Sequence, residues 1–348
     1  MSKIRVLIID DSALMRQLLT DLLQQDRDIE VVGVAGDPYT AWDRIKLTNP
    51  DVLTLDVEMP KMDGLTFLEK LMLARPMPVV MISSLTERGN QTTLRALELG
   101  AVDFVSKPRI DVASGTVALA DEIIAKVKAA ARARVRPGSA TPRPTVQKGR
   151  VAGPNIRMTH KVIAIGGSTG GTEALCELLA ALPPDSPGVV AVLHMPPGFT
   201  ASYAQRLDRV CQMRASEARD GDRILPGHVL MAPGGLHTSV VRSGASYSVR
   251  VFNGEPVNRH KPSVDVLFRS CAESLGSNCV GVILTGMGND GAAGLLAMRQ
   301  AGARTLAQDE ATCVVYGMPR EAVALGAAEE VLPLGKLAER SLMLARQN

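Results

Sequence analysis

Residues 162–175 read VIAIGGSTGGTEAL, a short apolar run followed by a glycine-rich turn. The run at 162–165 predicts a buried strand, and a helical pattern begins at about Thr172. Ser168 lies between them in a Gly-x-Ser-x-Gly arrangement, which is typical of a serine whose hydroxyl is exposed on a sharp strand-to-helix turn. A buried strand that leads directly into a helix favours an α/β fold.

The turn around Ser168 allows three interpretations when it is considered alone. Ser168 is a nucleophile, or the glycines cradle a phosphate at the N-terminus of the following helix, as in dinucleotide-binding folds. In the third interpretation the segment is a tight strand-to-helix turn without any chemistry. Short glycine motifs do not distinguish these cases, so the rest of the chain has to decide.

Length and composition exclude several classes of protein. The chain has 348 residues, enough for two domains, and its 46% hydrophobic and 22% charged residues are typical of a globular soluble protein. It contains no apolar run of about 18 residues or more, so we expect no transmembrane helix and no membrane insertion. The first apolar run is short and is followed by Asp10 and Asp11, which is unlike a signal peptide, and we expect a cytoplasmic protein.

The cysteines give no sign of a metal site or of a disulfide framework. No two of the five form a C-x-x-C pair. They fit small core residues of a reduced protein. Their positions are Cys176, Cys211, Cys271, Cys279 and Cys313.

Basic charge is concentrated in one segment. Residues 126–161 contain ten Lys/Arg and no Asp/Glu, whereas the rest of the chain carries 29 basic and 36 acidic residues. Several prolines discourage regular structure there, and we interpret residues 126–157 as a basic linker between two domains. No helix-turn-helix pattern or basic recognition helix is visible, so nucleic acid is not an expected partner.

Residues 1–125 alternate apolar runs with helical patterns. The apolar runs cover residues 4–9, 30–35, 51–55, 78–83 and 102–106, and helical patterns such as 12–25 and 86–99 lie between them. Five strands that alternate with helices predict an open, doubly wound parallel sheet of the flavodoxin-like kind.

Polar residues follow four of these predicted strands. Asp10 and Asp11 follow the first strand, Asp56 follows the third, Ser83 ends the fourth, and Lys107 follows the fifth. Because ligands of such sheets bind at the carboxyl ends of the strands, we expect these side chains to converge at one edge. Three carboxylates at one edge favour a hard dication such as Mg²⁺, and a nearby lysine can pair with a carboxylate or with a phosphoryl group.

This first domain resembles the receiver domain of two-component response regulators. The resemblance rests on Asp56, on the following residues VEMPKMDG (57–64) and on the late pair Lys107-Pro108. It implies that Asp56 accepts a phosphoryl group from a histidine kinase, and that Asp10 and Asp11 hold Mg²⁺ together with Asp56. Such a modification adds roughly −1.5 to −2 charge and reshapes one face of the domain. The resemblance also assigns switch roles to Ser83, Phe104 and Lys107.

Residues 158–348 predict a second doubly wound, mainly parallel α/β domain. The apolar run 188–193 ends directly before His194, and the run 278–286 ends shortly before Asp290, just as Ser168 follows the run 162–165. If these strands are parallel in one sheet, all three side chains lie at the same edge. A serine needs a histidine to take its proton and a carboxylate to orient that histidine, so this agreement favours a nucleophile.

Other histidines and aspartates of this domain could also serve as the general base or as the carboxylate that orients it. The rival bases are His160, His228, His237 and His260, and the rival acids are Asp222, Asp265 and Asp309. We expect His237 in a polar loop and His260 in a loop before a helix, and none of the four follows a predicted strand as His194 does. The order Ser, His, Asp differs from the order in α/β-hydrolases. A dinucleotide site would place an acidic residue where this chain has His194.

The residues between the predicted strands that precede Ser168, His194 and Asp290 include a different pattern, that of short strands joined by turns. The segments 228–233, 239–242 and 247–252 read as strands and a hairpin, and we expect them to form an antiparallel addition to the main sheet. The last segment, residues 336–347, predicts a terminal helix.

The second domain resembles the catalytic domain of the chemotaxis protein-glutamate methylesterase family (CheB). The resemblance rests on five segments: IGGSTGG (165–171), HMPPGFT (194–200), PVNRH (256–260), LTGMGNDG (284–291) and GMPRE (317–321). One departure is Gly167, where the family pattern would have alanine; it should loosen the turn slightly without removing a chemical group. Together with the receiver, the resemblance covers nearly the whole chain apart from the linker.

The resemblance implies an activity. The enzyme would hydrolyse glutamate γ-methyl esters on methyl-accepting chemotaxis receptors with release of methanol, and would deamidate receptor glutamines. Ser168 would attack the carbonyl, His194 would act as base and then as acid, and Asp290 would orient His194. The backbone N–H groups of Met287 and Thr169 would hold the oxyanion. No metal is needed for this step, and Mg²⁺ serves the receiver only.

The resemblance also implies a mode of control. A chemotaxis histidine kinase would phosphorylate the receiver, and an unphosphorylated receiver tethered by the linker would block the Ser168 edge. We expect a monomer. The alternative function is a response regulator whose second domain only binds a nucleotide or the receptor, without catalysis.

Overall fold

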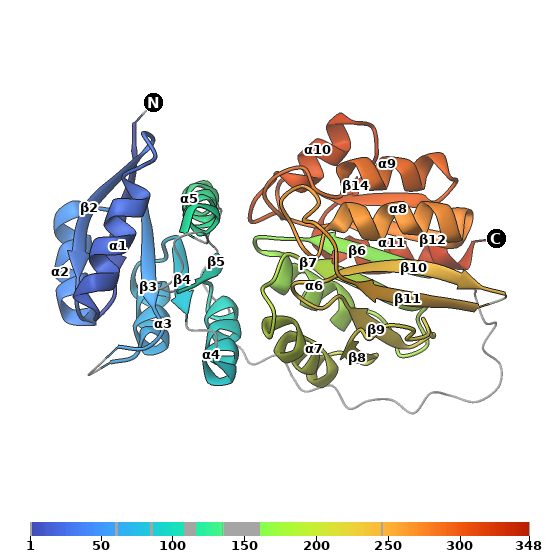
Figure 1. The fold of residues 1–348 in the computed structure, drawn as a ribbon, viewed down its shortest axis with the longest axis horizontal. Coiled ribbons are helices and arrows are strands. Elements are labelled where there is room, and N and C mark those ends of the chain that lie inside the picture. The colour runs from blue at the N-terminus through green and yellow to red at the C-terminus, as the bar shows by residue number, and fades with distance from the viewer. Residues whose placement is uncertain are drawn as a thin grey trace. The chain divides into compact units, whose positions relative to one another are not determined.

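The computed structural model of the protein describes residues 2–59, 62–83, 86–107, 116–133, 135, 161–244 and 246–347. The chain divides into two compact units, Met1–Pro142 and Arg143–Asn348, whose elements are labelled in Figure 1. Each unit contains its own parallel sheet. Within the described ranges, no helix combines the length and the apolar character needed to cross a bilayer.

The first unit contains a five-stranded parallel sheet in the order β2-β1-β3-β4-β5. Its strands are β1 (Ile4–Ile9), β2 (Ile29–Ala35), β3 (Val52–Asp56), β4 (Val79–Ser83) and β5 (Asp103–Ser106). Its helices are α1 (Ala13–Leu23), α2 (Pro38–Thr48), α3 (Gly64–Ala74), α4 (Glu87–Glu98) and α5 (Thr116–Ala131). The predicted flavodoxin-like sheet is confirmed, and every strand lies within one residue of its predicted bounds.

Helices of this unit begin where a polar side chain caps the first free N–H groups. Ser12, Asp37, Asp63 and Thr86 each accept a backbone hydrogen bond at the start of α1, α2, α3 and α4. A cap of this kind stabilises a helix by about 1 kcal/mol. Because α1 and its cap follow β1 so closely, Asp10 and Asp11 are held in a short connection at the sheet edge.

Helix α5 extends beyond the predicted end of the first domain at residue 125. Its side chains Ile123, Val127 and Ala130 are fully buried or nearly so at helical spacing, which accounts for its length. Lys126 and Lys128, which the sequence analysis assigned to the linker, pair with acidic groups of the first unit. Residues 136–160 lie outside the described residues, so the boundaries 1–125, 126–157 and 158–348 stay a prediction.

The second unit contains a seven-stranded sheet, parallel throughout, in the order β14-β13-β12-β6-β7-β9-β8. The strands are β6 (Val162–Gly167), β7 (Gly188–Leu193), β8 (Arg214–Glu217), β9 (His228–Met231), β12 (Cys279–Ile283), β13 (Arg304–Gln308) and β14 (Glu330–Leu332). The helices are α6 (Gly171–Ala180), α7 (Phe199–Val210), α8 (Val264–Leu275), α9 (Ala292–Gln300), α10 (Met318–Ala324) and α11 (Leu334–Arg346), with a short 3₁₀ turn at Gly276–Asn278.

The strand order places β6 at the point where the chain changes direction across the sheet. The chain continues from β6 to β7 on one side and later returns to β12 on the other side. In open α/β sheets, ligand sites form outside the carboxyl ends of the strands at this switch point. The loops after β6, β7 and β12 carry Ser168, His194 and Asp290, so the topology puts all three in the expected position.

The predicted antiparallel addition to the main sheet is wrong in its pairing. Strand β9 is a parallel member of the main sheet, paired with β7 and with β8. Strands β10 (His237–Ser243) and β11 (Ser246–Phe252) do form an antiparallel hairpin, but they make a separate two-stranded sheet (Figure 1). Val240 and Val249 are buried in the core that also contains Phe268 of α8. The apolar face of the hairpin is therefore buried by packing on a helix, not by pairing at a sheet edge.

Candidate active site and candidate phosphorylation site

Ser168 and His194 lie one residue beyond the paired ends of β6 and β7. Gly167 and Leu193 are partners in the register of these two strands, and the His194 N–H donates to the Gly167 carbonyl over 3.4 Å. On the other side of β6, the Ser168 N–H donates to the Thr285 carbonyl over 3.0 Å. Ser168 is thus fixed between the ends of β7 and β12.

The backbone around Ser168 requires glycine at two places. Gly170 has φ 75°, in the left-handed region, and a Cβ there would lie 2.6 Å from Val314. A Cβ on Gly286 would lie 2.9 Å from the Cβ of Ser168, so the backbone after β12 packs directly on the serine. The turn closes with a 2.7 Å hydrogen bond from the Gly171 N–H to the Ser168 carbonyl, at the start of α6.

His194 and Asp290 form a hydrogen-bonded pair. His194 Nε2 lies 2.8 Å from Asp290 Oδ2, and both side chains are almost completely buried. His194 Nδ1 is buried and has no hydrogen-bond partner in the part of the chain that the structure describes. Among the described residues, the Ser168 hydroxyl makes no hydrogen bond either. Since Asp290 is an acceptor, Nε2 carries the hydrogen and the lone pair is on Nδ1, the nitrogen able to take a proton.

Asp290 is held as a carboxylate by an unusually complete set of donors. Its side chain accepts hydrogen bonds from Asn258 Nδ2 (2.8 Å), Ser263 Oγ (2.7 Å) and the Val264 N–H (2.7 Å), with the Asp265 N–H at 3.2 Å. The last two belong to the first turn of α8, where the helix dipole favours an anion. Burial alone would raise the pKa of Asp290, but hydrogen bonds from His194, Asn258 and Ser263 lower it well below its usual range.

His260 packs face to face on His194. The two ring centroids are 3.6 Å apart and the planes differ by 9°. His260 is held by the turn 257–260, in which Val257 and His260 exchange backbone hydrogen bonds of 3.1 and 2.9 Å. The stack restricts the plane in which the His194 ring can lie.

Two predicted oxyanion donors lie beside the serine. Thr169 follows Ser168 directly, and its carbonyl accepts a 3.0 Å hydrogen bond from Thr285 Oγ1. Met287 follows Gly286, and its N–H donates to no residue in the described part of the chain. An unpaired backbone N–H next to a candidate nucleophile is the kind of group that stabilises an oxyanion.

Of the rival bases, His260 packs on the ring of His194, whereas His237 and His228 each begin a strand. His237 is the first residue of β10 rather than part of a polar loop, and it is buried between the Glu255 carbonyl and the Ser263 N–H. The loop prediction failed because the polar residues beside His237 concealed the apolar alternation of the strand. His228 begins β9, and His160 lies outside the described residues.

Sequence reasoning missed the groups that support the pair. Asn258, Ser263 and His260 come from a loop and a helix start far from Asp290 in sequence. The only local signal was Ser263, a cap-type residue directly before the apolar run of α8. Contacts between distant segments leave no pattern in a single sequence, so Asn258 and His260, although part of the family-like segment 256–260, received no supporting role from it.

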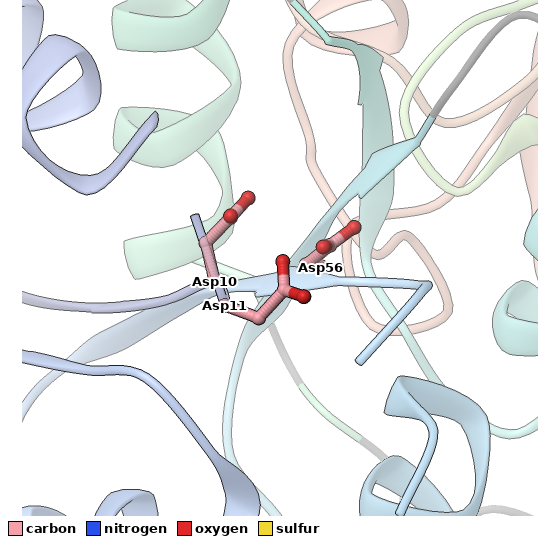
Figure 2. Close-up of side chains that lie close together, drawn as sticks. All are labelled: Asp10, Asp11 and Asp56. Atoms are coloured by element: carbon pink, nitrogen blue, oxygen red, sulfur yellow. The ribbon is translucent and has the colours of Figure 1, made fainter. Parts of the chain in front are cut away.

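The receiver carboxylates converge as predicted. Ligand oxygens of Asp10, Asp11 and Asp56 lie within 4.8 Å of one another at the ends of β1 and β3, and Figure 2 shows the three side chains. Lys107 Nζ lies 2.8 Å from Asp56 Oδ2 and 3.4 Å from Asp10 Oδ2. Burial raises the pKa of Asp56 to about 6, against the lowering effect of Lys107.

These residues fit a magnesium ion. The donor set consists of carboxylate oxygens, which hard dications prefer. Within the described ranges, Asp10 Oδ2 is buried and accepts no hydrogen bond, and its ion-pair contact to Lys107 at 3.4 Å shows that the position favours a cation. Burial raises the pKa of Asp10 as well. A divalent ion would relieve the cost of burying adjacent carboxylates.

The two other predicted switch residues are buried behind this cluster. Ser83, at the end of β4, has its hydroxyl 2.7 Å from Thr93 Oγ1 of α4. Phe104 of β5 is buried, with Lys126 Nζ 5.1 Å from its ring centroid. Of the three predicted switch residues, Lys107 contacts the carboxylate cluster directly.

Comparison with known proteins identifies relatives over the whole chain. The sequence pattern of the family described as CheB methylesterase matches residues 163–341, and that of the response regulator receiver domain matches residues 6–114. A protein-glutamate methylesterase/protein-glutamine glutaminase 2 of Bordetella avium (strain 197N) is 58% identical over 346 residues, which are 99% of this chain and 98% of the relative. A protein-glutamate methylesterase/protein-glutamine glutaminase of Salmonella typhimurium is 58% identical over 342 residues, 98% of this chain and 97% of the relative. The crystal structure of the Thermotoga maritima CheB methylesterase catalytic domain is 38% identical with a TM-score of 0.52, covering 53% of this chain and 98% of that domain.

Proposed function

This chain belongs to the CheB methylesterase family and also contains a response regulator receiver domain, and from that premise we propose that it is a serine hydrolase controlled by phosphorylation. It hydrolyses glutamate γ-methyl esters on chemotaxis receptors, releases methanol, and deamidates receptor glutamines. The observation that carries the proposal is His194, which follows the strand end paired with that of Ser168, is bound to Asp290 through Nε2, and has an Nδ1 without a hydrogen-bond partner among the described residues.

The proton path follows from this tautomer. His194 Nδ1 takes the proton of the Ser168 hydroxyl while Oγ forms a bond to the ester carbonyl carbon. The same nitrogen then gives the proton to the departing methoxy oxygen, so methanol leaves and an acyl-serine remains. Water attacks the acyl carbon, its proton passes to Nδ1 and on to Ser168, and a glutamate carboxyl is released. With glutamine as substrate the leaving group is ammonia, and the other steps are the same.

The developing negative charge has donors close to Ser168. The Met287 N–H donates to none of the described residues and follows Gly286, whose backbone packs against the serine side chain. We assign it, with the Thr169 N–H, to the oxyanion. One lost oxyanion donor typically lowers kcat by about 10²–10³-fold. Side chains and backbone groups of this protein supply the nucleophile, the base and the oxyanion donors. We assign no metal to hydrolysis.

Asp56 is the proposed phosphoacceptor. Asp10, Asp11 and Asp56 would hold Mg²⁺, which neutralises charge between the carboxylates and the incoming phosphoryl group. Lys107, now paired with Asp56 and Asp10, would turn to the phosphoryl oxygens. Ser83 would leave Thr93 for the same oxygens, and Phe104 would follow it. A chemotaxis histidine kinase is the proposed donor.

Methanol release from methylated chemoreceptor membranes tests the proposal. Wild-type protein and Ser168→Ala are compared, each with and without acetyl phosphate as a small phosphodonor. We expect release that requires Ser168 and rises with the phosphodonor. Release that does not respond to the phosphodonor would support the esterase activity and contradict its control by phosphorylation. Full release by Ser168→Ala would overturn the serine mechanism and favour a second domain that only binds.

A further inference from the structure

The turn at residues 257–260 has an unusual backbone. Val257 and His260 exchange two backbone hydrogen bonds, so Asn258 and Arg259 form a two-residue turn with φ 52° and 68°. Turns with two positive φ values favour Asn-Gly, because glycine adopts this region without strain. Asparagine tolerates it, whereas arginine is strained there. The sequence therefore keeps a strained turn next to the candidate active site.

The Asn258 side chain joins two buried carboxylates. Its Nδ2 donates one hydrogen to Asp290 Oδ1 over 2.8 Å and the other to Asp265 Oδ2 over 2.9 Å. The amide thus separates two carboxylates that are 1% and 3% exposed. Two residues further on, the same turn places the His260 ring on His194. One four-residue turn supports both members of the His194–Asp290 pair.

We propose that Asn258 is a positioning residue that sets the charge and the orientation of the His194–Asp290 pair. The inference rests on the proposed function and deepens it. Asn258 touches neither Ser168 nor a substrate; it acts through Asp290. Its amide N–H group partly neutralises the negative charge of Asp290, the carboxylate that binds His194. Its left-handed backbone fixes the turn that packs His260 on the His194 ring.

The electrostatic part of the inference depends on the groups around Asn258. Asp265, which also accepts from the Gly294 N–H, lies 3.8 Å from Arg269 Nη2 of the next helical turn. The titratable and charged groups around the His194–Asp290 pair reach it through different contacts. His260 packs on His194, and Asp265 is joined to Asp290 through Asn258. Arg269 lies beside Asp265, and His237 accepts from the Ser263 N–H. Removal of the amide leaves Asp290 with more uncompensated charge, and this charge favours the protonated form of the imidazole next to it.

Two backbone-compatible substitutions test the inference in the full-length protein. Asn258→Gly removes the amide and fits φ 52° without strain. Asn258→Asp keeps the shape and the tolerance for this backbone, but places a third carboxylate between Asp265 and Asp290. Arg259→Gly is the matched control, because it changes the same turn and the exposed Arg259 side chain makes no hydrogen bond or ion pair with the described residues. The readouts are kcat, KM and the pH profile of methanol release, with unfolding curves for each variant.

We expect Asn258→Gly to lower kcat about 10-fold with KM within about 2-fold, and to move the acid limb of the pH profile upward by about half a unit. Asn258→Asp should move that limb further in the same direction, and Arg259→Gly should leave it unchanged. A purely structural role would lower only the folded fraction. If both Asn258 variants keep the wild-type acid limb while Ser168→Ala is inactive, the inference is overturned and the serine mechanism stands. If Ser168→Ala keeps full activity, the proposed function itself has failed.

Discussion

Two glycines of the Ser168 turn are required to different degrees. Gly167 has an ordinary extended backbone, and an added Cβ would lie 3.1 Å from Leu193 and 3.3 Å from Leu284, which small side-chain shifts can relieve. Gly170 combines φ 75° with a Cβ position 2.6 Å from Val314. The expected effect of Gly167 is therefore a higher conformational entropy of the unfolded chain, which slightly lowers the stability of the turn.

Alanine substitutions should separate these two cases. Gly167→Ala should change the free energy of unfolding by less than about 1 kcal/mol and keep esterase activity. Gly170→Ala should lose about 2 kcal/mol or more, since alanine is strained at positive φ and collides with Val314. Urea unfolding of the full chain measures both. Equal losses for the two variants would contradict this account of the turn.

The raised pKa of Asp56, about 6, predicts a pH-dependent stability of the receiver unit. The carboxyl has a higher pKa in the folded than in the unfolded state, so its ionisation destabilises the fold. Stability from this group is lost as the pH rises from about 4 to 6, by up to about 3 kcal/mol, and stays lost above that. Asp56→Asn should therefore raise the unfolding free energy at pH 8 and have little effect at pH 4.

Magnesium supplies the control for this expectation. At pH 8, millimolar Mg²⁺ should raise the thermal midpoint of wild-type receiver unfolding, and it should do so far less in Asp56→Asn, which lacks one carboxylate ligand. Calorimetry of the full chain at pH 4 and pH 8, with and without Mg²⁺, gives both results. A wild-type midpoint that Mg²⁺ leaves unmoved at pH 8 would argue against the assigned site.

Sequence patterns located the residues that stand at strand ends and missed the residues that support them. Asp10, Asp56, Ser168 and His194 follow buried apolar runs, and the sheet brings such ends together whatever lies between them. Asn258 donates to Asp290 across 32 positions of sequence, through a turn whose backbone no local pattern announced. Its role depends on tertiary packing alone.

Among the helices, α4 holds the predicted switch serine. Thr93 Oγ1 lies 2.7 Å from both Ser83 Oγ and the Gly89 carbonyl, and all three groups are buried. The Ser83 hydroxyl also lies 3.5 Å from the Gly89 carbonyl, so the two hydroxyls are hydrogen-bonded to each other and share this carbonyl as an acceptor. Movement of Ser83 toward a phosphoryl group on Asp56 would have to break this link.

Thr93→Val should therefore favour the active form. The substitution removes the hydroxyl that is hydrogen-bonded to Ser83 Oγ at nearly constant volume, and a lost hydrogen bond of about 1 kcal/mol corresponds to roughly a 5-fold lower acetyl phosphate concentration for half-maximal methanol release. Thr93→Ser, which keeps the hydroxyl, is the control and should behave as wild type. An unchanged or higher concentration requirement for Thr93→Val would show that α4 does not restrain Ser83.

Strand existence was easier to predict than strand pairing. The apolar runs of the main sheets matched the observed strands closely because both faces of these sheets are covered by helices, which leaves continuous apolar stretches. The sequence pattern of β9 resembles that of the hairpin that follows it, so its parallel pairing with β7 could not be predicted from the sequence. Short strands such as β8, with its mixed residues Arg214–Glu217, gave no signal at all.

For the molecule as a whole, charge was a poor guide to the boundary between the units. Lys126 and Lys128 belong to the basic run but serve α5, where they pair with Asp103 and Asp26. The composition of a segment reports its average character, whereas a helix ends where its last apolar contact is made. The buried face of α5 therefore carries the first unit past residue 125.

The two-unit organisation leads to the last prediction, which concerns removal of residues 1–142. The second unit has its own sheet and core, and a CheB catalytic domain has been crystallised by itself, so this part should fold alone. If the unphosphorylated receiver restrains the hydrolase, the truncated chain should release methanol faster than the intact protein without phosphodonor. It should also ignore acetyl phosphate, because Asp56 is gone.

Ser168→Ala in the truncated chain gives the background of the assay, and Asp56→Asn in the intact chain separates loss of the phosphoacceptor from loss of the unit. Asp56→Asn should be slow and unresponsive, whereas the truncated chain should be fast and unresponsive. A truncated chain slower than the unphosphorylated protein on receptor substrate would mean that the receiver contributes to activity instead of restraining it. A small neutral ester as second substrate then distinguishes the two ways of slowing. If the truncated and intact chains hydrolyse that ester at equal rates, the Ser168 chemistry is intact. The receiver would then contribute to binding of the protein substrate.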